Sequence, residues 1–109
     1  MTTLEIVQII GDALTQFDVL LANPDFPSSK PQWQQVYALR KQLDDQQRQL
    51  VAAAFDESTP QFAQATAQLK SADDTLKQIG GDITKVASVI KLAATLASAA
   101  DQLLGLAKL

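Results

Sequence analysis

The stretch VIKLAATLASAADQLLGLAKL, residues 89–109, decides how the whole chain is interpreted. Its alanines and leucines suit a membrane segment, a surface-active helix or the central helix of a soluble bundle. Lys91 and Asp101 limit its longest uncharged run to Leu92–Ala100, well short of the roughly 18–20 apolar residues that a membrane span needs. Each charge near the centre of a span costs about 2.5–3.5 kcal/mol, whereas each leucine returns only about 0.3–0.6 kcal/mol. A lone membrane span is therefore not expected.

A polar stripe along this helix separates the two other interpretations. Its members recur at 4-3-4-3-4 spacing, which places them on one helical face; they are Thr84, Ser88, Lys91, Thr95, Ser98 and Gln102. Interfacial membrane helices usually carry Lys or Arg on the polar face and bulky side chains opposite it. This stripe is mostly hydroxyl and amide, and alanine makes up much of the opposite face. The pattern favours the central helix of a bundle.

The apolar face of the last helix is wider than the stripe that a bundle helix normally buries. We therefore predict that part of it, including Leu92, Leu96 and Leu103, contacts a second copy of the chain. The alternative is a membrane-active component, pore-forming or membrane-binding, that uses the helical hairpin of residues 60–109.

Three further segments show helical periodicity. Apolar residues recur every three or four positions in each, beginning with Val7, Val36 and Phe62 respectively. The proline-rich stretch ANPDFPSSKPQ (22–32), the stretch DESTP (56–60) and Gly80-Gly81 separate the helices. The sequence thus predicts a single all-α domain, 1–109, folded as an antiparallel up-down four-helix bundle with antiparallel neighbours. The predicted helices cover residues 3–21, 31–55, 60–79 and 83–107.

Composition excludes several kinds of chemistry. The chain has no cysteine and no histidine, so disulfides, thiol catalysis and the commonest general base are not available. The net charge is −3, and residues 30–109 carry no basic stripe that could neutralise phosphates, so nucleic-acid binding is not expected. The N-terminus has no basic region typical of a signal peptide, which favours the cytoplasm or an export route without a cleaved signal.

Isolated matches to catalytic or metal motifs have simpler explanations. Ser88 and Lys91 have the Ser-x-x-Lys spacing of penicillin-recognising enzymes, but the accompanying Ser-Asp-Asn and Lys-Thr-Gly tripeptides are missing. The adjacent pairs Asp44-Asp45 and Asp73-Asp74 point about 100° apart on a helix. We assign these aspartates to solvated faces, and we predict no catalytic residue, metal, cofactor or small-molecule ligand.

Trp33, Tyr37 and Arg40 form the best candidate for a binding patch outside the last helix. They lie one turn apart and belong to residue types enriched at interface hot spots. The competing interpretation is that Trp33 and Tyr37 cover the end of the core beside the 22–32 loop. The sequence as a whole predicts a non-enzymatic interaction protein that self-associates through its last helix. Adaptor, chaperone-like and toxin-neutralising roles all fit this prediction.

Overall fold

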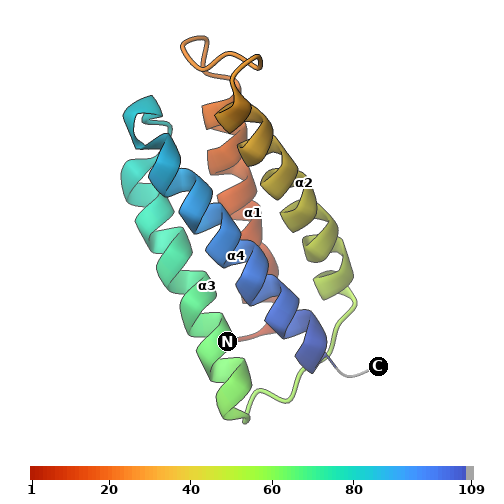
Figure 1. The fold of residues 1–109 in the computed structure, drawn as a ribbon. Coiled ribbons are helices and arrows are strands. Elements are labelled where there is room, and N and C mark those ends of the chain that lie inside the picture. Colours follow the sequence, from red (N-terminus) through yellow and green to blue (C-terminus); the bar gives the residue numbers. More distant parts are fainter. Residues whose placement is uncertain (108–109) are drawn as a thin grey trace.

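The computed structural model describes residues 1–107 of the chain. These residues form an all-α four-helix bundle about 44 Å long and 18–22 Å across, in which the chain alternates in direction from helix to helix (Figure 1). The predicted fold class is therefore confirmed. The helices are α1 (Thr3–Leu21), α2 (Pro31–Val51), α3 (Pro60–Ile79) and α4 (Val86–Leu106), and a short 3-10 turn, Ile83–Lys85, leads into α4.

The helices do not follow one another around the bundle in sequence order. Helix α1 packs against α2 and α3, and α4 packs against the same two helices, so that α2 and α3 lie diagonally opposite each other. The loop of residues 52–59 crosses the end of the bundle from α2 to α3 (Figure 1). The molecule therefore consists of two antiparallel hairpins, α1–α2 and α3–α4, whose facing helices run parallel. Neighbouring helices are antiparallel only within each hairpin. The sequence predicts that α2 and α3 are also antiparallel neighbours, but they lie diagonally opposite each other.

The end of α2 explains how this crossing is possible. The predicted helix 31–55 ends at Val51 instead, and the chain turns where the Ala53 N–H donates to the Leu50 carbonyl at 3.0 Å. Phe55 then packs against Phe62 of α3, with ring centroids 5.3 Å apart. The eight residues 52–59 can extend about 26 Å. That length exceeds a bundle diagonal of about 14 Å, estimated from an interhelical spacing of about 10 Å.

The expected helix signals are present at the other boundaries. Thr2 and Glu5 form a capping box, and the Thr59 and Asp82 side chains accept backbone N–H groups at the start of α3 and of the 3-10 turn. Gly80 ends α3 with φ 48° and ψ −133°. The positive φ explains why a glycine is found at this position.

Helix α4 contributes the largest set of buried residues among the four helices. The other helices cover much of the apolar face of α4. The apolar surface of α4 that stays exposed is therefore smaller than the sequence predicts. Within the described chain, the helical run Ile83–Leu106 is the one segment long and apolar enough to cross a membrane, with a mean hydropathy of 1.4. In the bundle, 39% of that hydrophobic window is buried. The buried residues of α4 are Val86, Val89, Ala93, Leu96, Ala97, Ala99, Ala100 and Leu103.

Candidate functional site

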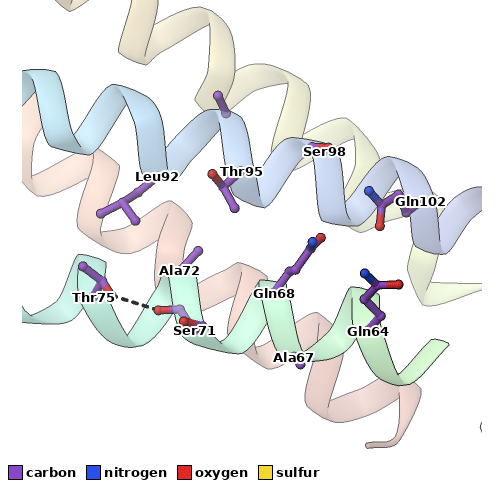
Figure 2. A pocket seen from close by; sticks show the side chains of 11 residues that line it. Gln64, Ala67, Gln68, Ser71, Ala72, Thr75, Leu92, Thr95, Ser98 and Gln102 are labelled. Carbon is purple, nitrogen blue, oxygen red and sulfur yellow. Dashed lines mark hydrogen bonds between the residues drawn. The ribbon is translucent and has the colours of Figure 1, made fainter. Parts of the chain in front are cut away.

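An open groove of about 810 Å³ lies between α3 and α4. Figure 2 shows Gln64 and Gln68 projecting from α3 toward α4, and Gln102 projecting back from α4. We call this depression the α3–α4 groove. Its lining residues are Gln64, Ala67, Gln68, Ser71, Ala72 and Thr75 from α3, and Leu92, Ala94, Thr95, Ser98 and Gln102 from α4.

The chemistry of the groove follows from the outer positions of its two helices. Every lining side chain is an amide, a hydroxyl or an apolar group, and none is ionisable. Alanine, serine and threonine are short, so the two helices leave a shallow trough between them. The Thr75 and Thr95 hydroxyls each donate to the carbonyl four residues earlier in their own helix, at 3.0 Å. The groove therefore presents neutral hydrogen-bonding groups between small apolar ones, and it contains no general acid or base.

A second depression of about 480 Å³ extends the groove toward the end of α4. It shares Gln64, Gln68 and Gln102 with the first depression and adds Gln61, Gly105 and Leu106. The side-chain amides of the glutamines can both donate and accept hydrogen bonds. This part of the surface is thus rich in groups that can pair with their own kind.

The sequence identifies polar residues on the α4 side of the groove but none on the α3 side. Thr95, Ser98 and Gln102 belong to the polar stripe of α4, and the structure places them along the groove. Their partners on α3, such as Gln68 and Ser71, were not identified as site residues. The available signal was that their positions fall opposite the apolar seam of α3. The sequence could not show that these two polar faces lie side by side.

The leucines predicted to meet a partner have mixed positions. Leu96 and Leu103 are fully buried in the bundle's own core, where no partner can reach them while the chain stays folded. Leu92 is half-buried and lines the groove. The exposed part of α4 therefore consists mainly of alanine and the polar stripe rather than of these leucines.

The second predicted patch lies on α2, away from the groove. The Trp33 and Tyr37 rings stack with centroids 5.4 Å apart and an interplanar angle of 10°. The Trp33 indole N–H donates to the Leu21 carbonyl at 2.9 Å, which ties the start of α2 to the end of α1. Tyr37 is 46% exposed. Trp33 thus has a structural role at the end of the core, and Tyr37 remains accessible to a partner.

Arg40, the third member of that patch, is held by α1. Its guanidinium forms a bidentate pair with Asp18, at 2.9 and 3.2 Å, and also lies 3.8 Å from Asp44. The hydrogen bond to Asp18 raises the pKa of Arg40 above its ordinary value. This bidentate pair uses two of the five guanidinium N–H donors and fixes the Arg40 side chain against α1.

Asp73 departs from the predicted solvated face, because only 1% of this residue is exposed. One carboxylate oxygen has no hydrogen-bond partner, and the other lies 3.4 Å from the Lys77 ammonium. Lys77 also lies 3.3 Å from Asp12 of α1, and the hydrogen bond to Asp12 is the main cause that raises the pKa of Lys77. Burial raises the pKa of Asp73, and Lys77 opposes this shift only in part. The neighbouring Asp74 is exposed and pairs with Lys70 at 3.4 Å, as predicted for a surface residue.

No cluster of three or more potential metal ligands occurs among residues 1–107. Comparison with known proteins gives no further guide, because no family model, curated protein or solved structure matches the chain.

Proposed function

We propose that the chain is a non-enzymatic interaction protein whose α3–α4 groove binds a second copy of the same chain. The observation that carries this proposal is the composition of the groove, which is lined by amides, hydroxyls and small apolar groups. Small side chains allow helices to approach closely, as in other helix–helix interfaces.

Symmetry explains why such a surface suits a homodimer. In a two-fold interface the same patch occurs on both sides, so a group near the axis meets its own copy and any other group meets the residue on the opposite side of the axis. A charged patch would repel its copy. Amides and hydroxyls instead both donate and accept hydrogen bonds, so the α3–α4 groove is complementary to itself.

The charge of the other faces supports the same choice. Helix α1 carries Glu5, Asp12 and Asp18 and no Lys or Arg. Asp12 and Asp18 are already paired with Lys77 and Arg40, so α1 has no positive charge of its own to offer to the acidic residues of a second copy. Lys91 belongs to the polar stripe but does not line the groove. Its long aliphatic stem allows the ammonium to stay in water beside an interface.

The available area is enough for a modest interface. Two adjacent helices of about 20 residues present a face about 30 Å long and about 20 Å wide, or about 600 Å² per chain. Two such faces bury about 1,200 Å², which is the lower end of the range for specific complexes. We therefore expect a reversible dimer with a dissociation constant in the micromolar range.

Two matched threonine substitutions test this surface. Thr95 lines the groove and Thr15 lies on the outer face of α1; both are exposed, and both hydroxyls donate to the carbonyl four residues earlier, at 3.0 and 3.1 Å. Thr95→Glu and Thr15→Glu change the net charge equally. In sedimentation velocity, we expect the wild type and Thr15→Glu to approach twice the chain mass of 11.7 kDa as concentration rises, and Thr95→Glu to stay monomeric.

Two results would contradict different parts of the proposal, namely self-association itself and the choice of the α3–α4 groove. A wild-type chain that stays monomeric at several hundred micromolar rules out self-association at the proposed strength. A dimer that Thr95→Glu does not weaken shows that another face mediates association.

Membrane activity of the α3–α4 hairpin is the second candidate function. The observation in its favour is the helical run Ile83–Leu106, which is apolar and long enough to cross a bilayer. Co-sedimentation with phosphatidylcholine vesicles, with and without anionic lipid, tests it directly. Protein that stays in the supernatant with both vesicle types argues against this candidate.

A further inference from the structure

Two buried side-chain atoms in the described chain have no hydrogen-bond partner, namely one oxygen each of Gln46 and Asp73. Gln46 of α2 uses its amide nitrogen to donate to the Ala97 carbonyl of α4 at 3.0 Å, while its own oxygen is unpaired. Asp73 of α3 is linked to α1 only through Lys77, which it shares with Asp12. Both unpaired atoms therefore lie where the α1–α2 hairpin packs against the α3–α4 hairpin.

The inside of the α1–α2 hairpin is different. The Trp33 indole binds the Leu21 carbonyl near one end, and the Arg40–Asp18 pair lies one turn further along. Toward the other end of the hairpin, the Gln47 amide donates to the Val7 carbonyl at 3.0 Å. Satisfied polar bonds thus join α1 to α2 along most of their length.

The packing permits the same division. Of the four interfaces between neighbouring helices, α1–α3 is the least extensive, and separating the hairpins breaks fewer close contacts than separating α1 and α3 from α2 and α4. Detaching α1 alone would break fewer still, but the hydrogen bonds and the ion pair that join α1 to α2 oppose it. Only the 52–59 loop connects the hairpins covalently. Opening between the hairpins would let water reach the unpaired oxygens of Gln46 and Asp73, which offsets part of the lost apolar contact. Opening between the hairpins also breaks the Gln46–Ala97 hydrogen bond and the Lys77–Asp12 pair. Opening within the α1–α2 hairpin breaks three polar links and exposes no unpaired buried atom in return.

We propose that the bundle opens as two intact hairpins, α1–α2 and α3–α4, which separate about the 52–59 loop before the chain unfolds globally. This motion is independent of the proposed dimer. It exposes the inner apolar face of α4, which the closed bundle covers. Partial openings of this kind occur between cooperative units of a fold, where the packing is less stable than within each unit.

Single-cysteine labelling tests the motion, because the native chain contains no cysteine. Ala97 borders the seam between the hairpins and is 4% exposed, and Ala99, seven residues after Leu92, is fully buried on the side of α4 that faces α3. Under native conditions with excess thiol reagent, we expect Ala97→Cys to react at least tenfold faster than Ala99→Cys. Thr66, seven residues before Asp73 and 6% exposed, shares the α1-facing side of α3. Thr66→Cys provides a reporter on the second seam.

One motion exposes both seams, so the Ala97→Cys and Thr66→Cys thiols should react at the same opening-limited rate when reagent is saturating. The use of two reporters keeps the test informative if one variant fails to fold by circular dichroism. An Ala99→Cys thiol that reacts as fast as the seam thiols overturns the proposal, because α3 and α4 would then separate as easily. Two folded seam variants whose saturating rates differ tenfold also overturn it, because the seams would open separately.

Discussion

Replacing Asp73 with asparagine should stabilise the bundle at neutral pH. The carboxylate is buried with one unpaired oxygen, and its only counterion is Lys77 at 3.4 Å, whose side chain is 48% exposed. A half-exposed ion pair contributes about 0–1 kcal/mol, whereas a buried charge costs more than a buried neutral polar group of the same shape. Asparagine keeps the shape and still leaves one polar atom unpaired, but it removes the charge. We expect the free energy of unfolding to rise by about 1 kcal/mol, which corresponds to about 4 °C in Tm.

The pH dependence isolates this effect. Burial raises the folded-state pKa of Asp73 above 3.8, and its charged neighbours are Lys77, Asp74 and Asp12. A raised pKa means that the folded state holds this proton more tightly than the unfolded chain, so the contribution to stability is present in acid. It is lost as pH rises from about 3.8 through the folded pKa. Asp73→Asn should therefore match the wild type near pH 3 and exceed it at pH 7.

Urea unfolding followed by circular dichroism at several pH values measures both quantities. Asp74→Asn is the matched control, because Asp74 is adjacent, exposed and paired with Lys70 at 3.4 Å, and it changes the net charge by the same amount. We expect the control to lower stability by at most about 0.5 kcal/mol. The reasoning is refuted if Asp73→Asn is less stable than the wild type at pH 7, because the pair with Lys77 would then outweigh the cost of burial.

Three further substitutions test how the bundle is held together. Trp33→Ala removes the stacked ring and its hydrogen bond to α1, so thermal unfolding should show a loss of about 2–4 kcal/mol, while the sedimentation behaviour stays unchanged. Gly11→Ala places a methyl 3.4 Å from the Gln47 amide, an ordinary contact, and should raise the free energy of unfolding by about 0.5–1 kcal/mol through helix propensity; a loss would indicate that the helices cannot accommodate it. A Cβ at Gly81 lies 3.2 Å from a methyl of Val19, so Val19→Cys with Gly81→Cys should form a disulfide on oxidation. Its chain-entropy contribution is about 4 kcal/mol, measurable as a Tm difference between oxidised and reduced protein.

The number, type and boundaries of the helices could be predicted because the signals are local. Proline, glycine and capping residues such as Thr59 act on the backbone within a few positions. One exception is the start of the last helix, predicted at residue 83, where a 3-10 turn occupies Ile83–Lys85 and α4 begins at Val86. The other is the end of α2, where Phe55 lies outside the helix and packs against Phe62. That contact depends on the position of α3, which no window of the α2 sequence contains.

The candidate site could be predicted only in part. The polar stripe of α4 was visible from its spacing, but its matching face on α3 was not, because only packing shows which surfaces become neighbours. For the same reason, the width of the apolar face does not identify which leucines of α4 are exposed to a partner. Leu96 and Leu103 are buried by the other helices of the same chain. Sequence periodicity shows that a residue is buried, but not whether its own chain or a second chain buries it.

The sequence by itself determined four amphipathic helices, the breaks between them and a chain without cysteine or histidine, since periodicity and turn chemistry are properties of short segments. The tertiary structure alone decided that α2 lies beside α4 rather than α3, that Asp73 is buried, and that an uncharged groove forms between α3 and α4. Each of these features depends on residues far apart in the chain, which meet only when the two hairpins pack around a common core.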